Sequence, residues 1–340
     1  MKVNAITTTI IFDAFALNKD ENLARNVLSI KTLKRKDRVL SFMSKYAMRH
    51  YLLETLKEGS NWKIADVTTC KSKSGKDEAV LQFDLTKYDI INSEELDAFG
   101  YMFTIGGQGA ITRKATLHIT KAISLEPYKG DTILYANHEL VQRGIRQGLN
   151  ATPDIFYEQE HNSLFKASFT IDCKRLGIDE WFFDSYDEKK KIGIIKPKKE
   201  GKGQEFTKDF SNYPSELIST EKVCNKVKVI FKIPPEKKKE RILQILNAIK
   251  DGFYSYAGES NTIVPLFMIA SGVKVPSPIF FPYLDVDMQQ VIGIKDCLAN
   301  GWIDTKVFIY ASGKLKVKPE DITQNVTKDW NEFIKELELL

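Results

Sequence analysis

The amino-acid sequence predicts an α+β protein. Two segments carry apolar residues at helical spacing, and segments rich in β-branched residues stand before, between and after them. The chain has 340 residues, of which 43% are hydrophobic, enough to bury the core of one large domain or of two ordinary ones. Without its insertions, the predicted order of elements is strand, helix, strand, strand, helix, strand.

The N-terminal part supplies the first strand and the first helix. Val3–Phe12 is rich in Ile and Thr and predicts a buried strand, and the polar residues 18–22 favour a turn after it. Arg38–Leu56 predicts one amphipathic helix, which ends before Gly59. The segment that leads into this helix is basic, with Lys31, Lys34, Arg35, Lys36 and Arg38.

This predicted helix has an apolar face and a basic flank. At about 100° per residue, one face holds Val39, Met43, Tyr46, His50 and Leu53. A neighbouring face holds Arg38, Lys45 and Arg49. Lys and Arg side chains gathered on one surface neutralise phosphates without reading a base sequence.

The middle of the chain predicts an insertion and two core strands. The helical signal weakens after Asn61, and polar loops interrupt the apolar runs. Ala115–Leu125 is partly period-two and predicts one strand, and Leu164–Cys173 predicts a second, with Phe and Ala alternating along one face. Tyr186–Asp209 is rich in Lys and Gly and predicts a mobile loop or protruding hairpin rather than core.

The C-terminal part completes the pattern. A predicted strand, Val227–Ile233, precedes two prolines, and Glu236–Lys250 then predicts the second helix, with an acid at its start and Lys at its end. Asn261–Ser271 predicts a further strand, and a β segment near Lys306–Tyr310 and a helix at Lys328–Leu340 follow. The order matches the split βαβ ferredoxin-like pattern, and so the RNA-recognition-motif (RRM) fold.

Composition and motifs exclude several classes of protein. The net charge is only +5, which is too small to prove a polyanionic partner. The four cysteines lie far apart without a CxxC pair, so neither disulfides nor zinc are indicated. The apolar stretches are too short to span a bilayer and the N-terminus reads as a strand, so we expect a cytoplasmic protein without membrane contact. Motifs of hydrolases, zinc proteases and nucleotide-binding loops are missing, so no cofactor is expected.

Basic and glycine-rich positions are the main candidates for binding. Arg113 and Lys114 stand just before a predicted core strand, which would hold them in place to bind phosphates. The glycines at Gly106 and Gly107 favour a backbone that approaches a partner closely. A solvated surface remains the alternative for the lysines between residues 189 and 208.

Carboxylates and histidines give weaker signals. Asp13 and Asp20 follow the first predicted strand, where a carboxylate can bind a metal or sit in a solvated turn. The histidines do not show metal-ligand spacing, and structural roles are the better interpretation of His50, His118, His138 and His161.

One region resembles a known protein family. The run Leu96–Asp131 resembles the backbone subunit of type I-B CRISPR Cascade complexes, in the DevR-like branch of that family. The similar pieces are FGYM at Phe99–Met102, TRKA at Thr112–Ala115 and AISLEPY at Ala122–Tyr128. FDAFALN at Phe12–Asn18 and the segment Ser41–Leu52 also look like that family's opening, so the similarity covers most of roughly the first 175 residues.

The resemblance implies an architecture and a function. It implies an RRM-like palm of residues 1–60, 111–180 and 222–340, with residues 61–110 as part of a fingers insertion and residues 181–221 as a thumb-like basic loop or hairpin. Several copies would polymerise along a CRISPR RNA (crRNA), with handle-capping, large and small Cascade subunits, and present the guide to target DNA without catalysis. The RNA-binding residues would include Lys34, Arg35, Lys45, Arg49, Gly106, Gly107, Arg113, Lys114, Lys198 and Lys199.

Two other functions remain open. Related type III backbone subunits are RNases that use an aspartate after the first strand, so a metal-dependent endoribonuclease that uses Asp13 or Asp20 is the main alternative. A regulatory protein that binds nucleic acid outside any CRISPR complex is a third interpretation.

Overall fold

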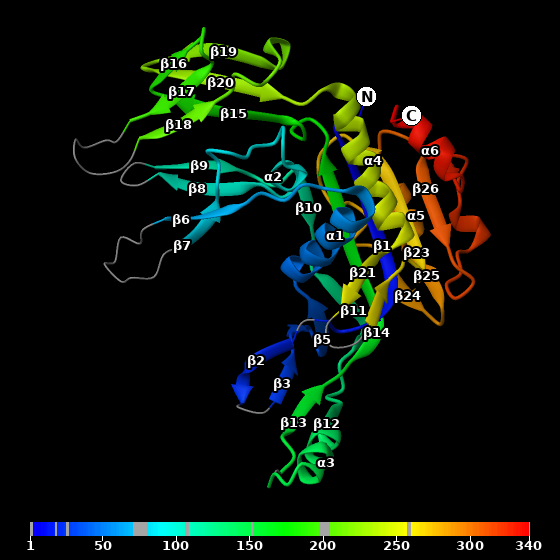
Figure 1. Ribbon diagram of the computed structural model, residues 1–340. Helices are drawn as coiled ribbons and strands as arrows, with labels where there is room; N and C mark the ends of the chain where they lie inside the picture. Colours follow the sequence, from blue (N-terminus) through cyan, green and yellow to red (C-terminus); the bar gives the residue numbers. More distant parts are fainter. Residues whose placement is uncertain are drawn as a thin grey trace.

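The protein is built on one large sheet. The computed structural model describes residues 3–17, 19–24, 27–70, 80–105, 109–150, 152–196, 205–256 and 260–339. The sheet has nine strands, and Figure 1 shows it at the centre, with a lobe on one side and an arm on the other. In spatial order its strands are β27 (Val326–Thr327), β26 (Val307–Ala311), β23 (Phe267–Val273), β1 (Ala5–Phe15), β14 (Asn162–Asp172), β11 (Ala122–Pro127), β5 (Arg38–Met43) and β4 (Thr32–Arg35), and β10 (Leu117–Ile119) also pairs with β14.

The central strands are buried on both faces. β1 lies antiparallel between β14 and β23. Ile6 and Phe12 point to one face and join the main hydrophobic cluster, while Ile11 points to the other face and joins a second cluster. Between them, Thr7 and Thr9 are buried and bond hydroxyls of β14. This double burial explains why β1 has no charged residue before Asp13 and shows no alternation of polar and apolar residues.

Helices cover one face of the sheet. α1 (Lys45–Ser60) and α4 (Pro235–Asp251) pack on each other and place Leu52, Leu56, Ile242 and Ile249 in the main cluster. α6 (Trp330–Glu336) adds Phe333 to the same cluster. The opposite face is covered by residues 274–306 with their β24 (Asp285–Asp287), β25 (Gln290–Ile292) and α5 (Ile294–Leu298).

The predicted first helix is wrong in its first part. Residues 38–43 form β5, which pairs with β4 and β11, and the helix begins only at Lys45, with Ser44 as its N-cap. The apolar face that was predicted for a continuous helix therefore does not exist: Tyr46 is 68% exposed, and His50 is exposed as well. The strand forms because residues 38–43, placed between β4 and β11, are hydrogen-bonded to a neighbouring strand on each side.

The other predicted helices and strands are confirmed with shifted bounds, but the turn predicted at residues 18–22 is wrong, because Lys19–Ala24 is a strand that pairs with Val27–Ile30. The first strand and the strand at residues 164–173 are β1 and β14. The strand at residues 115–125 is split into β10 and β11, and the strand at residues 261–271 into β22 (Ser260–Ile263), which pairs with β21 (Phe253–Tyr256), and β23. The second helix and both C-terminal elements are α4, β26 and α6, with η2 (Pro319–Asp321) between the last two. The α+β class is therefore confirmed.

The lobe has a hydrophobic core of its own. Trp181, Phe183, Phe206 and Phe210 are buried in it. In the described part of residues 186–209, residues 192–195 pair antiparallel with residues 206–209, which fits the hairpin form of the prediction, but the buried Ile195 and Phe206 make this hairpin part of a core rather than a segment outside it. At Gly193 a Cβ would lie 2.6 Å from the Phe183 ring, which explains the glycine in this lysine-rich segment. The lobe consists of β6 (Val67–Cys70), β7 (Val80–Phe83), α2 (Glu94–Phe99), β8 (Tyr101–Ile105), β9 (Gly109–Arg113), β15 (Ile178–Phe183), β16 (Ser185–Asp187), β17 (Ile192–Ile195), β18 (Phe206–Asp209), η1 (Ser215–Leu217), β19 (Ile218–Val223) and β20 (Lys226–Lys232).

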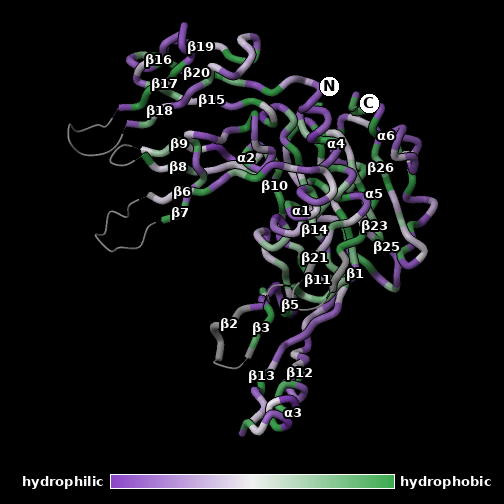
Figure 2. Tube along the Cα trace, viewed as in Figure 1, coloured by the Kyte–Doolittle hydropathy of each residue, from purple (hydrophilic) through white to green (hydrophobic). Residues whose placement is uncertain are grey.

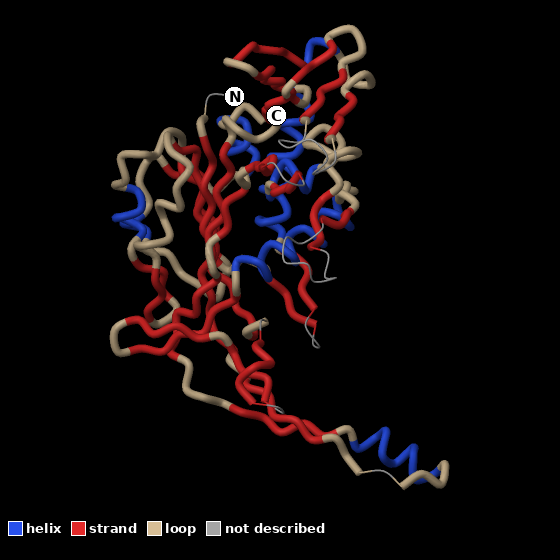
Figure 3. Tube along the Cα trace, turned by 90° about the vertical axis from the view of Figure 1, so that its left-hand side faces the viewer, coloured by secondary structure: helices blue, strands red, loops and turns tan. Residues whose placement is uncertain are grey.

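A slender arm projects from the opposite end of the sheet. It consists of β2 (Lys19–Ala24), β3 (Val27–Ile30), β12 (Thr132–Ala136), α3 (His138–Arg146) and β13 (Ile155–Gln159), and β13 pairs with both β12 and β3. Figure 3 shows the arm extending away from the body, with α3 near its tip. Among the described helices, none is long and apolar enough to cross a membrane.

Candidate nucleic-acid interface

The start of α1 lies at an exposed junction with β11. Met43 of β5 pairs with Ala122 of β11, so the antiparallel register places Lys121 opposite Ser44, directly beside the first helical residue, Lys45. The Ser44 side chain accepts a hydrogen bond from the amide of residue 47, which fixes the first turn of the helix. Two cations from different elements thus stand at one junction.

Each of these cations lies over an aromatic ring. The Nζ atom of Lys45 is 4.9 Å from the ring centre of Tyr46, and Nζ of Lys121 is 4.6 Å from the ring centre of Phe42. Both lysines are exposed, so their ammonium groups are hydrated and free to meet an anion. Tyr46 presents its ring to solvent, where a base can stack on it.

One turn further along α1, Arg49 links the helix to the lobe. Its guanidinium bonds Glu95 Oε1 at 2.9 Å and lies 4.7 Å from the ring centre of Phe99, both on α2. Burial raises the pKa of the Glu95 carboxyl. Arg49 is thus largely committed to holding α1 against α2, and Lys114, in the exposed link between β9 and β10, is the next unshielded cation.

These residues form what we call the concave strip: the exposed lysines Lys45, Lys114 and Lys121, the exposed ring of Tyr46, and the ion-paired Arg49. Figure 1 shows α1 and β10 on the inner side of the curve between lobe and arm. Exposed cations with an exposed ring can neutralise phosphates and stack on a base, without hydrogen bonds that would select a sequence.

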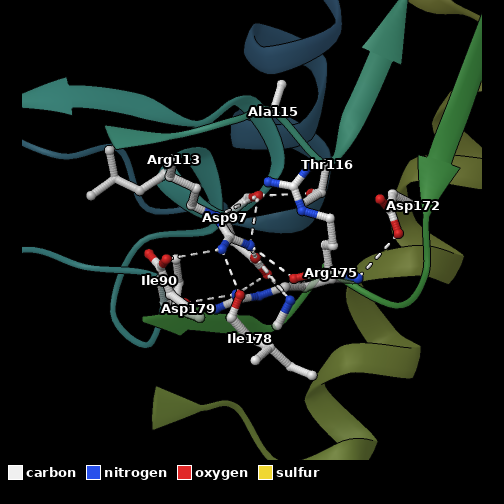
Figure 4. Close-up of polar contacts among 12 residues, drawn as sticks. Ile90, Asp97, Arg113, Ala115, Thr116, Asp172, Arg175, Ile178 and Asp179 are labelled. Carbon is white, nitrogen blue, oxygen red and sulfur yellow. Dashed lines mark hydrogen bonds and ion pairs between the residues drawn. The ribbon is translucent and has the colours of Figure 1, made fainter. Parts of the chain in front are cut away.

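Arg113, in contrast, has an internal role. Its side chain is only 3% exposed, and its Nη2 atom lies 2.6 Å from Oδ1 of Asp97 and 3.0 Å from the carbonyl oxygen of Arg175. A second carboxylate, Asp179, lies 3.3 Å away, and burial raises the pKa of that carboxyl. Figure 4 shows these groups around the Arg113 guanidinium, so its charge is compensated inside the fold.

Asp97 is the centre of this buried network. Its other oxygen, Oδ2, accepts a hydrogen bond of 2.7 Å from Arg241 of α4, and the amide of Gly177 donates to the same carboxylate at 2.8 Å. The network therefore joins α2 and β9 of the lobe to α4, which packs on the central sheet. A negative charge buried between two guanidinium groups stabilises the fold only while both partners remain.

The remaining predicted residues are scattered. Lys34 and Arg35 are exposed on the edge strand β4, away from α1. Gly106, Gly107, Lys198 and Lys199 lie outside the described residues. The RNA-binding roles of all these residues stay predictions.

The carboxylates of the alternative function are not gathered into a site. Asp13 is part of β1 itself, exposed, with Lys314 Nζ at 3.9 Å, and the Asp20 side chain lies outside the described residues. Within the described residues, no group of three or more possible metal ligands occurs.

Three histidines are exposed, and the fourth is buried. His50, His118 and His138 are exposed, whereas Nδ1 of His161 lies 2.7 Å from Ser41 Oγ inside the protein. Burial lowers the pKa of His161.

Sequence reasoning missed a buried lysine, Lys166 on β14. It is 7% exposed and opens onto a cavity of about 430 Å³ on the face of the sheet that is opposite to α1. No sequence signal indicated this burial: Lys166 stands between Phe165 and Ala167, which the period-two pattern places on the core face, so the pattern predicts that Lys166 points to solvent.

One family of known proteins matches most of the chain. The model of the family described as "CRISPR-associated negative auto-regulator DevR/Csa2" matches residues 6–292. A solved chain of a "CRISPR RNA-guided surveillance complex, pre-nicking" has a TM-score of 0.55 at 9% identity, and 98% of each chain is covered. A chain of another "CRISPR RNA-guided surveillance complex" has a TM-score of 0.49 at 8% identity, again with 98% of each chain covered. No curated protein matches.

Proposed function

Because the chain belongs to the DevR/Csa2 family of CRISPR-associated proteins, we propose that it is a crRNA-binding backbone subunit of a CRISPR surveillance complex. In this role several copies polymerise along one guide RNA and hold it for pairing with target DNA, together with the other subunits of a Cascade of type I-B. The fold shared with a chain of a surveillance complex supports this proposal. The observation that carries it is the concave strip.

We further assign the central sheet to the RRM-like class. The strand order β23-β1-β14-β11, all antiparallel, with α1 and α4 on one face, supports this assignment. In chain order these elements are strand, helix, strand, strand, helix, strand, as in the ferredoxin-like pattern.

The decisive binding test removes three charges of the concave strip. The variant with Lys45→Ala, Lys114→Ala and Lys121→Ala should bind single-stranded RNA more weakly, and the slope of log affinity against log salt should fall by about 0.7 for each phosphate that is no longer neutralised. A charge-matched control carries Lys316→Ala, Lys318→Ala and Lys328→Ala, all exposed near the C-terminus. Equal affinity and slope in both variants would remove the concave strip as the RNA site.

The biological setting is tested by the RNA that accompanies the protein. We expect the chain, co-expressed with a CRISPR array and its neighbouring genes, to purify with a uniform guide that has a repeat-derived end. The words "negative auto-regulator" in the family description leave binding outside a complex as the competing result. Random cellular RNA without other subunits would support that result.

The proposal includes no cleavage of RNA. Protein loaded with guide RNA should leave a complementary RNA intact in the presence of Mg²⁺. Regular cuts that disappear in Asp13→Ala or Asp20→Ala would instead establish the endoribonuclease alternative.

A further inference from the structure

The cavity beside Lys166 lies apart from the concave strip. The turn between β4 and β5, β11, β14 and residues 281–285 line it, and its volume of about 430 Å³ is within the usual range of small-molecule sites. Neighbouring residues of a strand point to opposite faces, and Phe165 belongs to the cluster under α1. Lys166 and the cavity are therefore on the other face of the sheet, near its free edge.

Lys166 is a buried cation that is only partly compensated, because the charge of Asp285, which also lines the cavity, acts on it from beyond ion-pair distance. Its ammonium donates a hydrogen bond to the carbonyl oxygen of Leu284 and lies 4.8 Å from the ring centre of Phe281. It forms no ion pair within the described part of the chain. A carbonyl and a ring face only partly replace water around an ammonium group, so the site retains unsatisfied positive charge.

Further cations stand at the mouth of the cavity. Arg35 and Arg38 face each other across the β4–β5 hairpin, with Lys36 and Asp37 in the turn between them, and all four are exposed, so three cations stand against one carboxylate at the mouth. None of them is ion-paired among the described residues. Burial lowers the pKa of Lys166, the charge of Asp285 opposes this change, and the nearby charge of Arg35 lowers the pKa again.

The opposite wall is aromatic and apolar. Phe281, Pro282 and Tyr283 line it, and Tyr283 is 45% exposed. A bare phosphate would leave this wall unused, whereas a ring attached to the phosphate would cover it. We propose that the cavity binds a nucleotide, with its phosphate held by Lys166 and Arg38 and its base or sugar against Tyr283. The site is separate from the concave strip and does not depend on the proposed function.

The test uses AMP as the probe and compares it with adenosine and inorganic phosphate by calorimetry on the full chain. AMP should bind best, because only AMP engages both walls. Lys166→Met and Arg38→Ala should each weaken AMP binding about tenfold or more, the usual effect of losing a charge-assisted bond. Lys318→Ala, exposed and outside the cavity, is the matched control and should bind AMP as the unchanged protein does. Arg38 is exposed, so its variant remains informative even if Lys166→Met folds poorly.

The outcomes separate the sources of the nucleotide and the two proposals. AMP binding that Arg38→Ala weakens supports a free nucleotide. If only a single-stranded RNA oligonucleotide binds, and Arg38→Ala weakens that binding, the nucleotide belongs to a chain. Binding of both ligands that neither variant changes, or binding of neither, overturns the cavity site. If RNA binding depends on the concave strip alone, the proposed function stands and the cavity site does not contribute to it. If AMP binds and RNA does not, the cavity site stands and the proposed function is wrong.

Discussion

At the scale of single residues, Asp97 shows how much of the fold depends on one buried carboxylate. Asp97→Asn keeps the size of the side chain but removes the charge that Arg113 and Arg241 share. Both guanidinium groups would remain buried without their main partner, so we expect the free energy of unfolding to fall by about 3–5 kcal/mol. Urea unfolding measures this loss.

The matched control for this variant is Glu94→Gln. Glu94 is a second, more exposed partner of Arg241, at 3.2 Å, so its loss should cost no more than about 1 kcal/mol. Equal losses in the two variants would show that Asp97 is not the centre of the network.

His161 predicts a stability that depends on pH. Burial lowers its pKa in the folded protein below the ordinary value of about 6.5, so the unfolded chain binds a proton more readily. The free energy of unfolding should therefore decrease as the pH falls below about 6.5. His161→Asn should show a shallower decrease between about pH 7 and pH 5.5, measured by denaturant unfolding across that range. An identical slope in the variant would assign the pH dependence to other groups.

Residue roles were the least predictable feature of the sequence. Arg113 and Lys114 are neighbours and looked equivalent, yet one is buried in the Asp97 network and the other is exposed. Alternation along an extended chain separates them, and the carboxylate that selects Arg113 comes from another element. Sequence identified the basic pair but not which member is free to meet a ligand.

At the scale of elements, α1 shows how a strand can hide inside a helical pattern. The apolar positions in residues 38–43 are compatible with the spacing of a helix and with that of a strand. These residues form a strand because they pair with β4 and β11. The cap at Ser44 is the local signal of the true start. Lys45 and Arg49 lie on one side of α1, as the predicted basic flank required, because the helix does form from Lys45 onward.

The cap itself is testable. Ser44→Ala removes the acceptor for the amide of Ala47, 3.2 Å away, so we expect a loss of about 1 kcal/mol in the free energy of unfolding. Ser44→Asp keeps an acceptor at the same position and should retain most of the stability. If both variants unfold alike, the cap contributes little and packing alone fixes the start of α1.

At the scale of the whole molecule, the inner strands of the central sheet were predictable, whereas the joining of two distant segments into the core of the lobe, and the arm, were not. Core strands and helices carry their period in the sequence, whereas the lobe joins segments that are far apart in the chain, such as Tyr101 and Trp181. The lysines of residues 186–209 indicated a solvated segment, yet β17 contains no lysine, and Lys208 of β18 is itself buried, with its Nζ atom 2.9 Å from Asp89. In the arm, none of the described residues between 131 and 160 belongs to any of the three hydrophobic clusters.

Because these residues belong to no hydrophobic cluster, we expect that the tip of the arm can be removed and that the rest of the chain still folds. Leu140, Ile145 and Leu149 are each more than half exposed, and Figure 2 shows hydrophobic residues along α3 at the tip of the arm. Ala136 and Ile155 face each other across β12 and β13, so a two-residue Asn-Gly turn can replace residues 137–154 between them. The shortened protein should keep its thermal unfolding midpoint, because no cluster is deprived of a residue.

The same deletion tests what the apolar tip is for. Under the proposed function, copies on one RNA must contact each other, and exposed apolar side chains on a projecting arm are suited to such a contact. The shortened chain should therefore bind a short RNA as the full chain does, yet fail to show the gain in affinity and the multi-copy complexes that a long RNA gives to the full chain. Sedimentation on RNAs of increasing length measures both. Unchanged assembly on long RNA would place the contact between copies elsewhere, and the concave strip alone would then explain RNA binding.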